Sequence, residues 1–141
     1  MTRKATTIHL YLLYVWLAGL VATVFLAGLG VFEVTTSSAL AKGSTKLVEA
    51  NRLDPHRIAG SLLVLGTLLV LIVAFTGRGS RRQVGASVAF FALGIVQLIL
   101  AGAGSGSGAA WGGLHVVNAF LLTGIAVGLV LEDRRVLGRP A

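Results

Sequence analysis

Residues 102–113 read GAGSGSGAAWGG, and they interrupt the longest uncharged stretch of the chain, the 49 residues 83–131. One crossing of a bilayer core takes roughly 20 helical residues, so this stretch is long enough for two spans. Clustered glycine and serine residues are typical of turns. The sequence therefore predicts one helix at about 83–103 and a second at about 111–131.

Two more uncharged stretches precede this one, 28 residues at 5–32 and 20 residues at 58–77. Each is long enough to cross a bilayer once, which predicts helices at about 8–32 and 55–77. The chain of 141 residues is 55% hydrophobic and 12% charged, whereas roughly a quarter of the residues of a soluble domain are charged. We therefore expect an all-α protein, an integral membrane four-helix bundle forming a single membrane domain over 1–141.

The basic residues predict how this bundle lies in the membrane, because Lys and Arg concentrate in cytoplasmic segments. Eight of the twelve stand in the two tails or in the short loop between the second and third helices: Arg3, Lys4, Arg78, Arg81, Arg82, Arg134, Arg135 and Arg139. We expect a multi-pass protein of the cell membrane, surrounded by lipid, with both termini cytoplasmic and two helical hairpins whose loops face outward. The net charge of +7 is then mostly a topology signal, and it implies no nucleic-acid partner.

A cleaved signal peptide is the alternative interpretation of the N-terminal segment. Ala39 and Ala41 form an A-x-A-like pattern after a basic start and an apolar run. That run is longer than the 7–15 residues of a typical signal-peptide core, which favours a membrane helix.

The chain has no cysteine, which excludes disulfides, iron–sulfur clusters, thiolate zinc sites and cysteine nucleophiles. The glycine-rich run lacks the lysine and the preceding strand of a phosphate-binding loop, and no Ser/His/Asp motif is evident. Metal chemistry would have to use histidines and carboxylates.

Two of the three histidines are predicted to lie at the same depth. His56 opens the second helix and His115 lies in about the first turn of the fourth, and both helices begin at the outer surface. A histidine inside a membrane segment is costly unless it faces the bundle interior and has a partner. The pair therefore predicts a shared ligand.

A small residue follows each of these histidines one helical turn deeper, Gly60 after His56 and Ala119 after His115. A porphyrin held by two imidazoles must lie close to the helix backbones, and small residues leave room for it. Helical bundles are an established setting for such sites. We expect haem, with its iron ligated by both histidines.

The segment LDPH at 53–56 resembles a helix start, with Asp54 as N-cap and Pro55 at the first helical position. The positive end of the helix dipole would keep the His56 ring neutral, as a metal ligand must be. Arg57 beside it is a candidate partner for haem propionates.

Simpler interpretations remain for each histidine. His56 could be wetted by lipid headgroups, and His115 could do no more than hydrogen-bond Gln97 or Asn118. His9 has no evident partner, and we expect it at the membrane interface within an aromatic belt of Tyr11, Tyr14 and Trp16.

Three stretches of the chain resemble the haem A synthase family. The run FEVTTSSAL at 32–40 is similar to the family's V-R-V-T-G-S-G-L run, and His56-Arg57 looks like its first H-R motif. VQLILAG at 96–102, followed by the glycine-rich loop and Leu114-His115, resembles its Q-x-x-L-G and L-H pair. Members of that family ligate haem through a histidine on helix 2 and another on helix 4 of a four-helix bundle.

The resemblance implies oxidation of the haem O methyl group to the formyl group of haem A. A loop carboxylate, Glu49 or Asp54 and less favourably Glu33, would handle protons or stabilise a cationic intermediate. Typical members have two such bundles in tandem, so this chain would be a compact variant that pairs as a homo-oligomer. A haem O synthase and terminal oxidase assembly proteins are the implied partners. The chain departs from the family in having Leu53 where a glutamate precedes the H-R motif, and in lacking the loop cysteines.

Two other functions fit the same residues. A non-enzymatic b-type cytochrome with two histidine ligands would need no loop carboxylate. A haem-free structural or subunit-interacting protein would use only the small-residue faces of the first and third helices.

Overall fold

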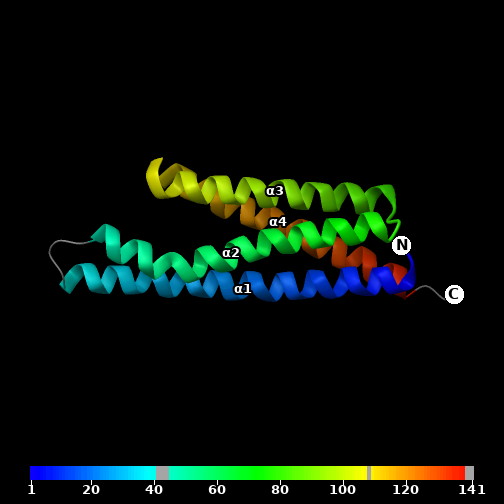
Figure 1. The fold of residues 1–141 in the computed structure, drawn as a ribbon, viewed down its shortest axis with the longest axis horizontal. Coiled ribbons are helices and arrows are strands. Elements are labelled where there is room, and N and C mark those ends of the chain that lie inside the picture. The colour runs from blue at the N-terminus through cyan, green and yellow to red at the C-terminus, as the bar shows by residue number, and fades with distance from the viewer. Residues whose placement is uncertain (41–44, 108, 139–141) are drawn as a thin grey trace.

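The computed structural model describes the backbone of residues 1–40, 45–107 and 109–138, and the side chains in these ranges except at 32–40, 45–53, 104–107 and 109. These residues form four helices and no strand: α1 (Arg3–Leu40), α2 (Thr45–Thr76), α3 (Arg81–Ser107) and α4 (Ala109–Leu137) (Figure 1). The predicted all-α fold with four helices is confirmed.

The four helices form a closed ring, in which α1 packs against α2 and α4, and α3 packs against the same two helices. Both termini lie at one end of the bundle, together with the turn between α2 and α3 (Figure 1). The C-terminal ends of α1 and α3 and the N-terminal ends of α2 and α4 lie at the opposite end (Figure 1). The chain thus forms the two predicted hairpins.

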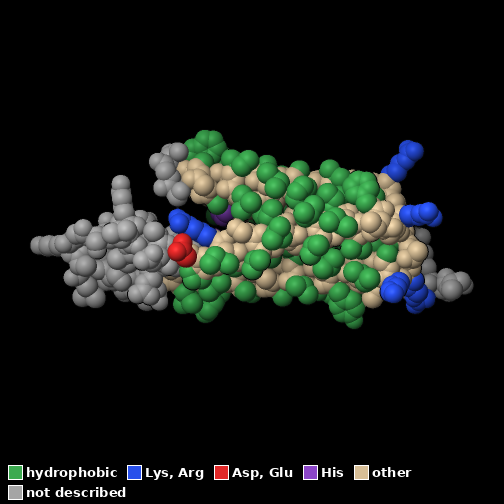
Figure 2. Space-filling view, viewed as in Figure 1, with side chains coloured by type: hydrophobic (Ala, Val, Ile, Leu, Met, Phe, Trp, Pro, Cys, Tyr) green, Lys and Arg blue, Asp and Glu red, His purple; other side chains and the backbone are tan. Residues whose placement is uncertain are grey.

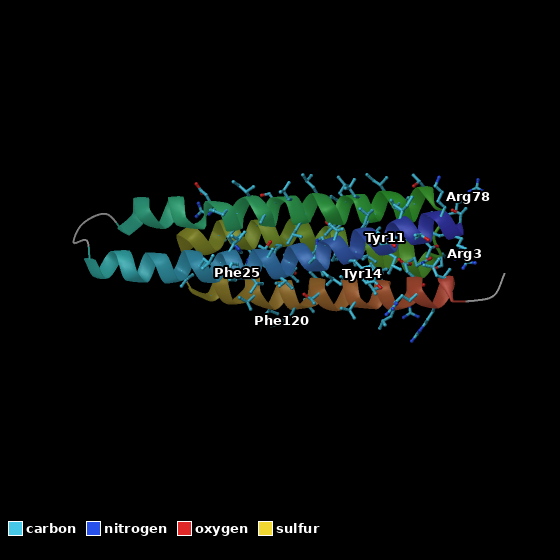
Figure 3. All side chains as sticks on the ribbon, turned by 90° about the horizontal axis from the view of Figure 1, so that it is seen from below. Arg3, Tyr11, Tyr14, Phe25, Arg78 and Phe120 are labelled. Carbon is cyan, nitrogen blue, oxygen red and sulfur yellow. The ribbon has the colours of Figure 1, made fainter. Side chains whose placement is uncertain are left out.

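Each helix contains a segment long and apolar enough to cross a membrane: Arg3–Val31, Asp54–Thr76, Arg81–Ala103 and Ala110–Leu137. Apolar side chains cover the body of the bundle, and Lys and Arg side chains stand out at the end that carries the termini (Figure 2). Phe25 and Phe120, both labelled in Figure 3, are 65% and 73% exposed. A surface of this kind is suited to hydrocarbon.

The helices extend further than the sequence predicts. The expected broad turn at 102–113 is wrong, because α3 continues to Ser107 and α4 begins at Ala109. Glycine lowers helix stability by about 1 kcal/mol relative to alanine. In a bilayer an unpaired backbone group would cost several kcal/mol, which is more than each glycine costs a helix.

The predicted start of the second helix is also wrong. Pro55 lies inside α2, which begins ten residues earlier at Thr45, so Asp54 is not an N-cap and His56 is not at the positive end of a helix dipole. Proline removes one backbone hydrogen bond and crowds the preceding turn, which bends a helix without ending it where the flanking residues remain helical. Figure 1 shows α2 changing direction in its N-terminal third.

The turn between α2 and α3 is built from local signals. Arg78 has a φ of 57°, the left-handed conformation that ends many helices. Ser80 Oγ accepts a hydrogen bond from the backbone N–H of Gln83 at 3.1 Å, and Gln83 Oε1 accepts one from the backbone N–H of Ser80 at 3.0 Å. This reciprocal capping box starts α3 and fixes the direction of the Gln83 side chain.

Trp16 lies in the core, which corrects its assignment to the aromatic belt. Its side chain is 3% exposed, its ring meets Phe90 edge-on at 4.7 Å, and Nε1 donates to the carbonyl of Leu63 at 2.9 Å. The indole N–H finds a partner within the bundle, so the large ring can be buried without an unsatisfied donor. Tyr11 and Tyr14 remain exposed (Figure 3).

Candidate functional site

The structure brings His56 of α2 and His115 of α4 together across the bundle. Their ring centroids are 6.4 Å apart, and the ring planes are inclined by 67°. Both side chains are half-buried. In Figure 2 a histidine is visible in a recess beside charged side chains, at the end of the described surface opposite the termini. The two histidines that share a depth in the sequence thus share a location in the fold.

The hydrogen bond of His56 determines which of its ring nitrogens can bind a ligand. Its Nδ1 lies 2.9 Å from the carbonyl oxygen of Thr23 in α1. A carbonyl can only accept, so Nδ1 carries the proton and Nε2 carries the lone pair. Metal-ligating histidines show the same arrangement, in which a backbone carbonyl orients the ring and fixes its tautomer.

His115 is hydrogen-bonded to Gln97 of α3, as the simpler interpretation of this residue expects. Its Nδ1 lies 3.3 Å from the Gln97 carbonyl oxygen, and Gln97 Nε2 lies 3.1 Å from both His115 Nε2 and the His115 carbonyl oxygen. Asn118 Nδ2 in turn donates to Gln97 Oε1 at 2.6 Å. Both ring nitrogens of His115 therefore meet Gln97.

A cavity of about 630 Å³ lies between the histidines and continues along the bundle. Gly60 and Ala119, the small residues predicted beside the pair, both line it. A Cβ added at Gly60 would meet no atom within 4 Å, so the absent side chain leaves open space beside His56. The volume is within the range of about 300–1,000 Å³ that ligand sites occupy.

The cavity opens sideways between α1 and α4. Val21 and Val24 of α1 and Val116 and Phe120 of α4 line it and are also exposed. These residues belong to segments suited to cross a membrane. An apolar molecule dissolved in the bilayer would therefore meet this opening directly.

The 6.4 Å separation of the ring centroids is close to that of two imidazoles on one iron, but in this structure His115 Nε2 lies against the Gln97 amide. A metal–imidazole bond is about 2.0–2.1 Å long and the ring centre lies about 1.1 Å beyond the nitrogen, so two opposed ligands place their ring centres roughly 6.3 Å apart. Among the residues whose side chains are described, no three His, Cys, Asp or Glu residues form a metal-binding group. A porphyrin brings four nitrogen ligands of its own, so haem iron would need only the two histidines.

The predicted acidic and basic residues lie outside this cavity or outside the described side chains. Arg57 and Asp54 are half-exposed, form an ion pair at 3.7 Å, and are not among the lining residues. Glu49 and Glu33 lie outside the residues whose side chains the structure describes. Asp54 is therefore not placed against the His56–His115 pair.

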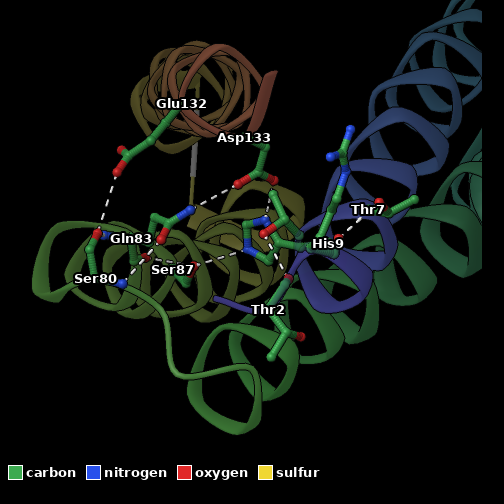
Figure 4. A network of polar contacts seen from close by, with 10 residues as sticks. Thr2, Thr7, His9, Ser80, Gln83, Ser87, Glu132 and Asp133 are labelled. Atoms are coloured by element: carbon green, nitrogen blue, oxygen red, sulfur yellow. Dashed lines mark hydrogen bonds and ion pairs between the residues drawn. The ribbon is translucent and has the colours of Figure 1, made fainter. Parts of the chain in front are cut away.

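His9 is the important residue that the sequence interpretation misplaces. It is fully buried, and its Nδ1 lies 2.6 Å from Oδ2 of Asp133 in α4 (Figure 4). Gln83 Nε2 donates to Oδ1 of the same carboxylate at 3.0 Å, and Ser87 Oγ lies 3.5 Å from His9 Nε2. The sequence places His9 and Asp133 near the same predicted membrane surface. Comparing the depths of these residues, as was done for His56 and His115, could therefore have found the pair.

Comparison of this chain with protein-family models, with curated proteins and with solved structures finds no match.

Proposed function

We propose that this chain is an integral protein of the cell membrane that binds haem between His56 and His115, with both termini in the cytoplasm. The observation that supports this most directly is the 6.4 Å separation of the two rings at the end of an apolar cavity. Haem iron takes two axial ligands, and the described part of the chain offers two imidazoles at the matching distance.

In this proposal each residue at the site has a distinct role. His56 presents Nε2 because Thr23 holds its other ring nitrogen, and Gly60 and Ala119 leave room for a flat ring. The apolar lining excludes water and favours a hydrophobic ligand. Arg57, half-exposed beside His56, is the candidate partner for a propionate.

The resemblance to haem A synthases supports an enzymatic activity, oxidation of the haem O methyl group to the formyl group of haem A. Haem iron would supply the redox chemistry when bound, and the protein would supply orientation and exclusion of water. Asp54 or Glu49 would move protons at the outer end. The implied partners are a haem O synthase and terminal oxidase assembly proteins, with a second copy of the chain completing the pair of bundles.

Electron transfer by a b-type cytochrome with two histidine ligands is the alternative. One observation favours it: among the residues whose side chains are described, those that line the cavity include no Asp or Glu. An electron carrier needs the two ligands and an apolar surrounding, but no group that moves protons.

Haem binding is tested by the absorption spectrum of the detergent-purified protein. We expect a Soret band in the wild type that is lost or strongly weakened in His56→Ala and His115→Ala. Val117→Ala, which alters an exposed residue two positions along α4, should leave it unchanged. A colourless wild type, or a band that neither histidine variant alters, rejects haem binding at this site.

The two activities are separated by expressing the chain together with a source of haem O and analysing the extracted haem as its pyridine haemochrome. Formation of haem A that depends on His56 and His115 supports the synthase. Bound haem that stays unconverted supports the cytochrome.

The orientation is tested with single cysteines, because the chain contains none of its own. A membrane-impermeant maleimide added to intact cells should label Gly112→Cys and spare Thr2→Cys. The reverse labelling pattern would place the termini outside.

A further inference from the structure

The polar contacts around Gln97 fix the tautomer of His115. Asn118 Nδ2 donates to the carbonyl of Leu93 at 2.9 Å as well as to Gln97 Oε1. This orients the Gln97 amide so that its Nε2 faces His115, where it also donates to the His115 carbonyl. Because the Gln97 backbone carbonyl can only accept, the proton of His115 is on Nδ1, and the lone pair is on Nε2.

The two candidate ligands are therefore not equivalent. The proton-bearing nitrogen of each ring meets a backbone carbonyl, Thr23 for His56 and Gln97 for His115. The lone pair of His115, in contrast, accepts a hydrogen bond from the Gln97 amide at 3.1 Å. That same lone pair would have to bind iron, and it cannot do both.

We propose that Gln97 is a positioning residue that makes His115 an exchangeable haem ligand. The proposal rests on haem binding between His56 and His115. The Nε2 lone pair of His56 would be available to hold haem, whereas that of His115 would be available only when His115 Nε2 leaves the Gln97 amide. With His115 held by Gln97, a small ligand could take the position that His115 would otherwise fill.

The strength of this competition follows from ordinary hydrogen-bond energetics. A net hydrogen bond in a folded protein shifts an equilibrium by roughly two- to tenfold. The Gln97 bond therefore does not prevent ligation by His115, but it shifts the equilibrium by that factor toward the state in which the second position is open.

The test compares Gln97→Leu with wild type after loading with haem. Leucine removes the competing donor, adds no metal ligand, and keeps the backbone carbonyl that orients Nδ1. We expect Gln97→Leu to shift the ferric spectrum toward the six-coordinate low-spin form. The apparent affinity for added imidazole, which competes with His115, should fall about two- to tenfold.

Thr76→Val is the matched control, because Thr76 does not line the cavity and its hydroxyl donates to the carbonyl of Ile72 within its own helix. It should leave both readouts unchanged. An increase in imidazole affinity in Gln97→Leu would show that Gln97 supports ligation, and an unchanged affinity would show that it has no influence; either result overturns the proposal.

Nitrogen-15 NMR of the haem-free protein, labelled at histidine, gives a readout that does not depend on haem. We expect the Nδ1–H tautomer for His115, and a shift of its Nε2 resonance in Gln97→Leu. A proton on Nε2 in the wild type would overturn the proposal. If the wild type binds haem but Gln97→Leu changes nothing, this inference fails alone; if it binds no haem, the proposed function fails as well.

Discussion

Nδ1 of His9 in α1 and Oδ2 of Asp133 in α4 are 2.6 Å apart, although 124 residues separate them in the chain, and both side chains are fully buried. Gln83 of α3 donates to the other carboxylate oxygen. The Asp133 carboxylate thus accepts one hydrogen bond from α1, in the first hairpin, and one from α3, in its own hairpin. This network ties the two hairpins together at the end that carries the termini (Figure 4).

Removing the carboxylate should strongly destabilise the bundle. Asp133→Leu leaves the His9 and Gln83 donors buried without their acceptor, and each buried unsatisfied donor costs about 1–3 kcal/mol. Glu132→Leu is the matched control, because Glu132 faces Arg82 and Ser80 at 3.7 and 3.4 Å on the surface. Exposed pairs contribute about 0–1 kcal/mol. Unfolding in SDS from detergent micelles measures both variants, and equal losses would show that the buried pair is not a major source of stability.

Filling the space beside His56 should abolish haem binding without unfolding the protein. In Gly60→Leu the new side chain enters open cavity space, and replacing a helical glycine recovers about 0.5–1 kcal/mol of helix stability. Gly124→Leu, where the added Cβ also meets no atom within 4 Å but the residue does not line the cavity, is the control. The Soret band and the SDS unfolding midpoint are measured together. Full haem binding in Gly60→Leu would place the haem elsewhere.

The lateral opening should be the route by which an apolar ligand enters. Val24→Trp puts a bulky ring at the opening between α1 and α4, so we expect slower loading from haem-containing vesicles. Val15→Trp is a matched control on the same helix, because Val15 is 70% exposed and does not line the cavity. Stopped-flow absorption gives the loading rate. Equal rates in the two variants would indicate another route.

Because α2 and α3 pack closely at Gly94, a larger residue at this position of α3 should destabilise the bundle. Gly85 of the same helix should tolerate substitution. A Cβ at Gly94 would lie 2.9 Å from Thr67 Oγ1, whereas one at Gly85 would meet nothing within 4 Å. Thr67 is buried and its hydroxyl donates to the carbonyl of Val64, so it has little room to move. We expect Gly94→Ala to cost about 1–3 kcal/mol and Gly85→Ala to be neutral or stabilising. SDS unfolding curves that coincide would contradict this packing.

The sequence by itself determined the number of helices, the two hairpins and the shared end of both termini. These features depend on length, hydropathy and charge, which a bilayer constrains strongly because every backbone polar group in hydrocarbon must be paired within the chain. The same constraint places His56 and His115 at equal depth, since depth follows from the position of a residue along its helix. Their similar depth therefore follows from one-dimensional information, whereas their facing each other required the packed bundle.

The tertiary structure decided what the side chains do once the helices pack. The partners of His9 and of the His115 lone pair come from other helices, and they depend on how each helix is rotated about its axis. Local pattern says little about that rotation when apolar residues surround a helix on all sides. α2 continues through Pro55 because the residues before the proline are also helical. The local cap signal at 53–56 does not reveal this. Depth could be read along the chain, but partners required the packed bundle.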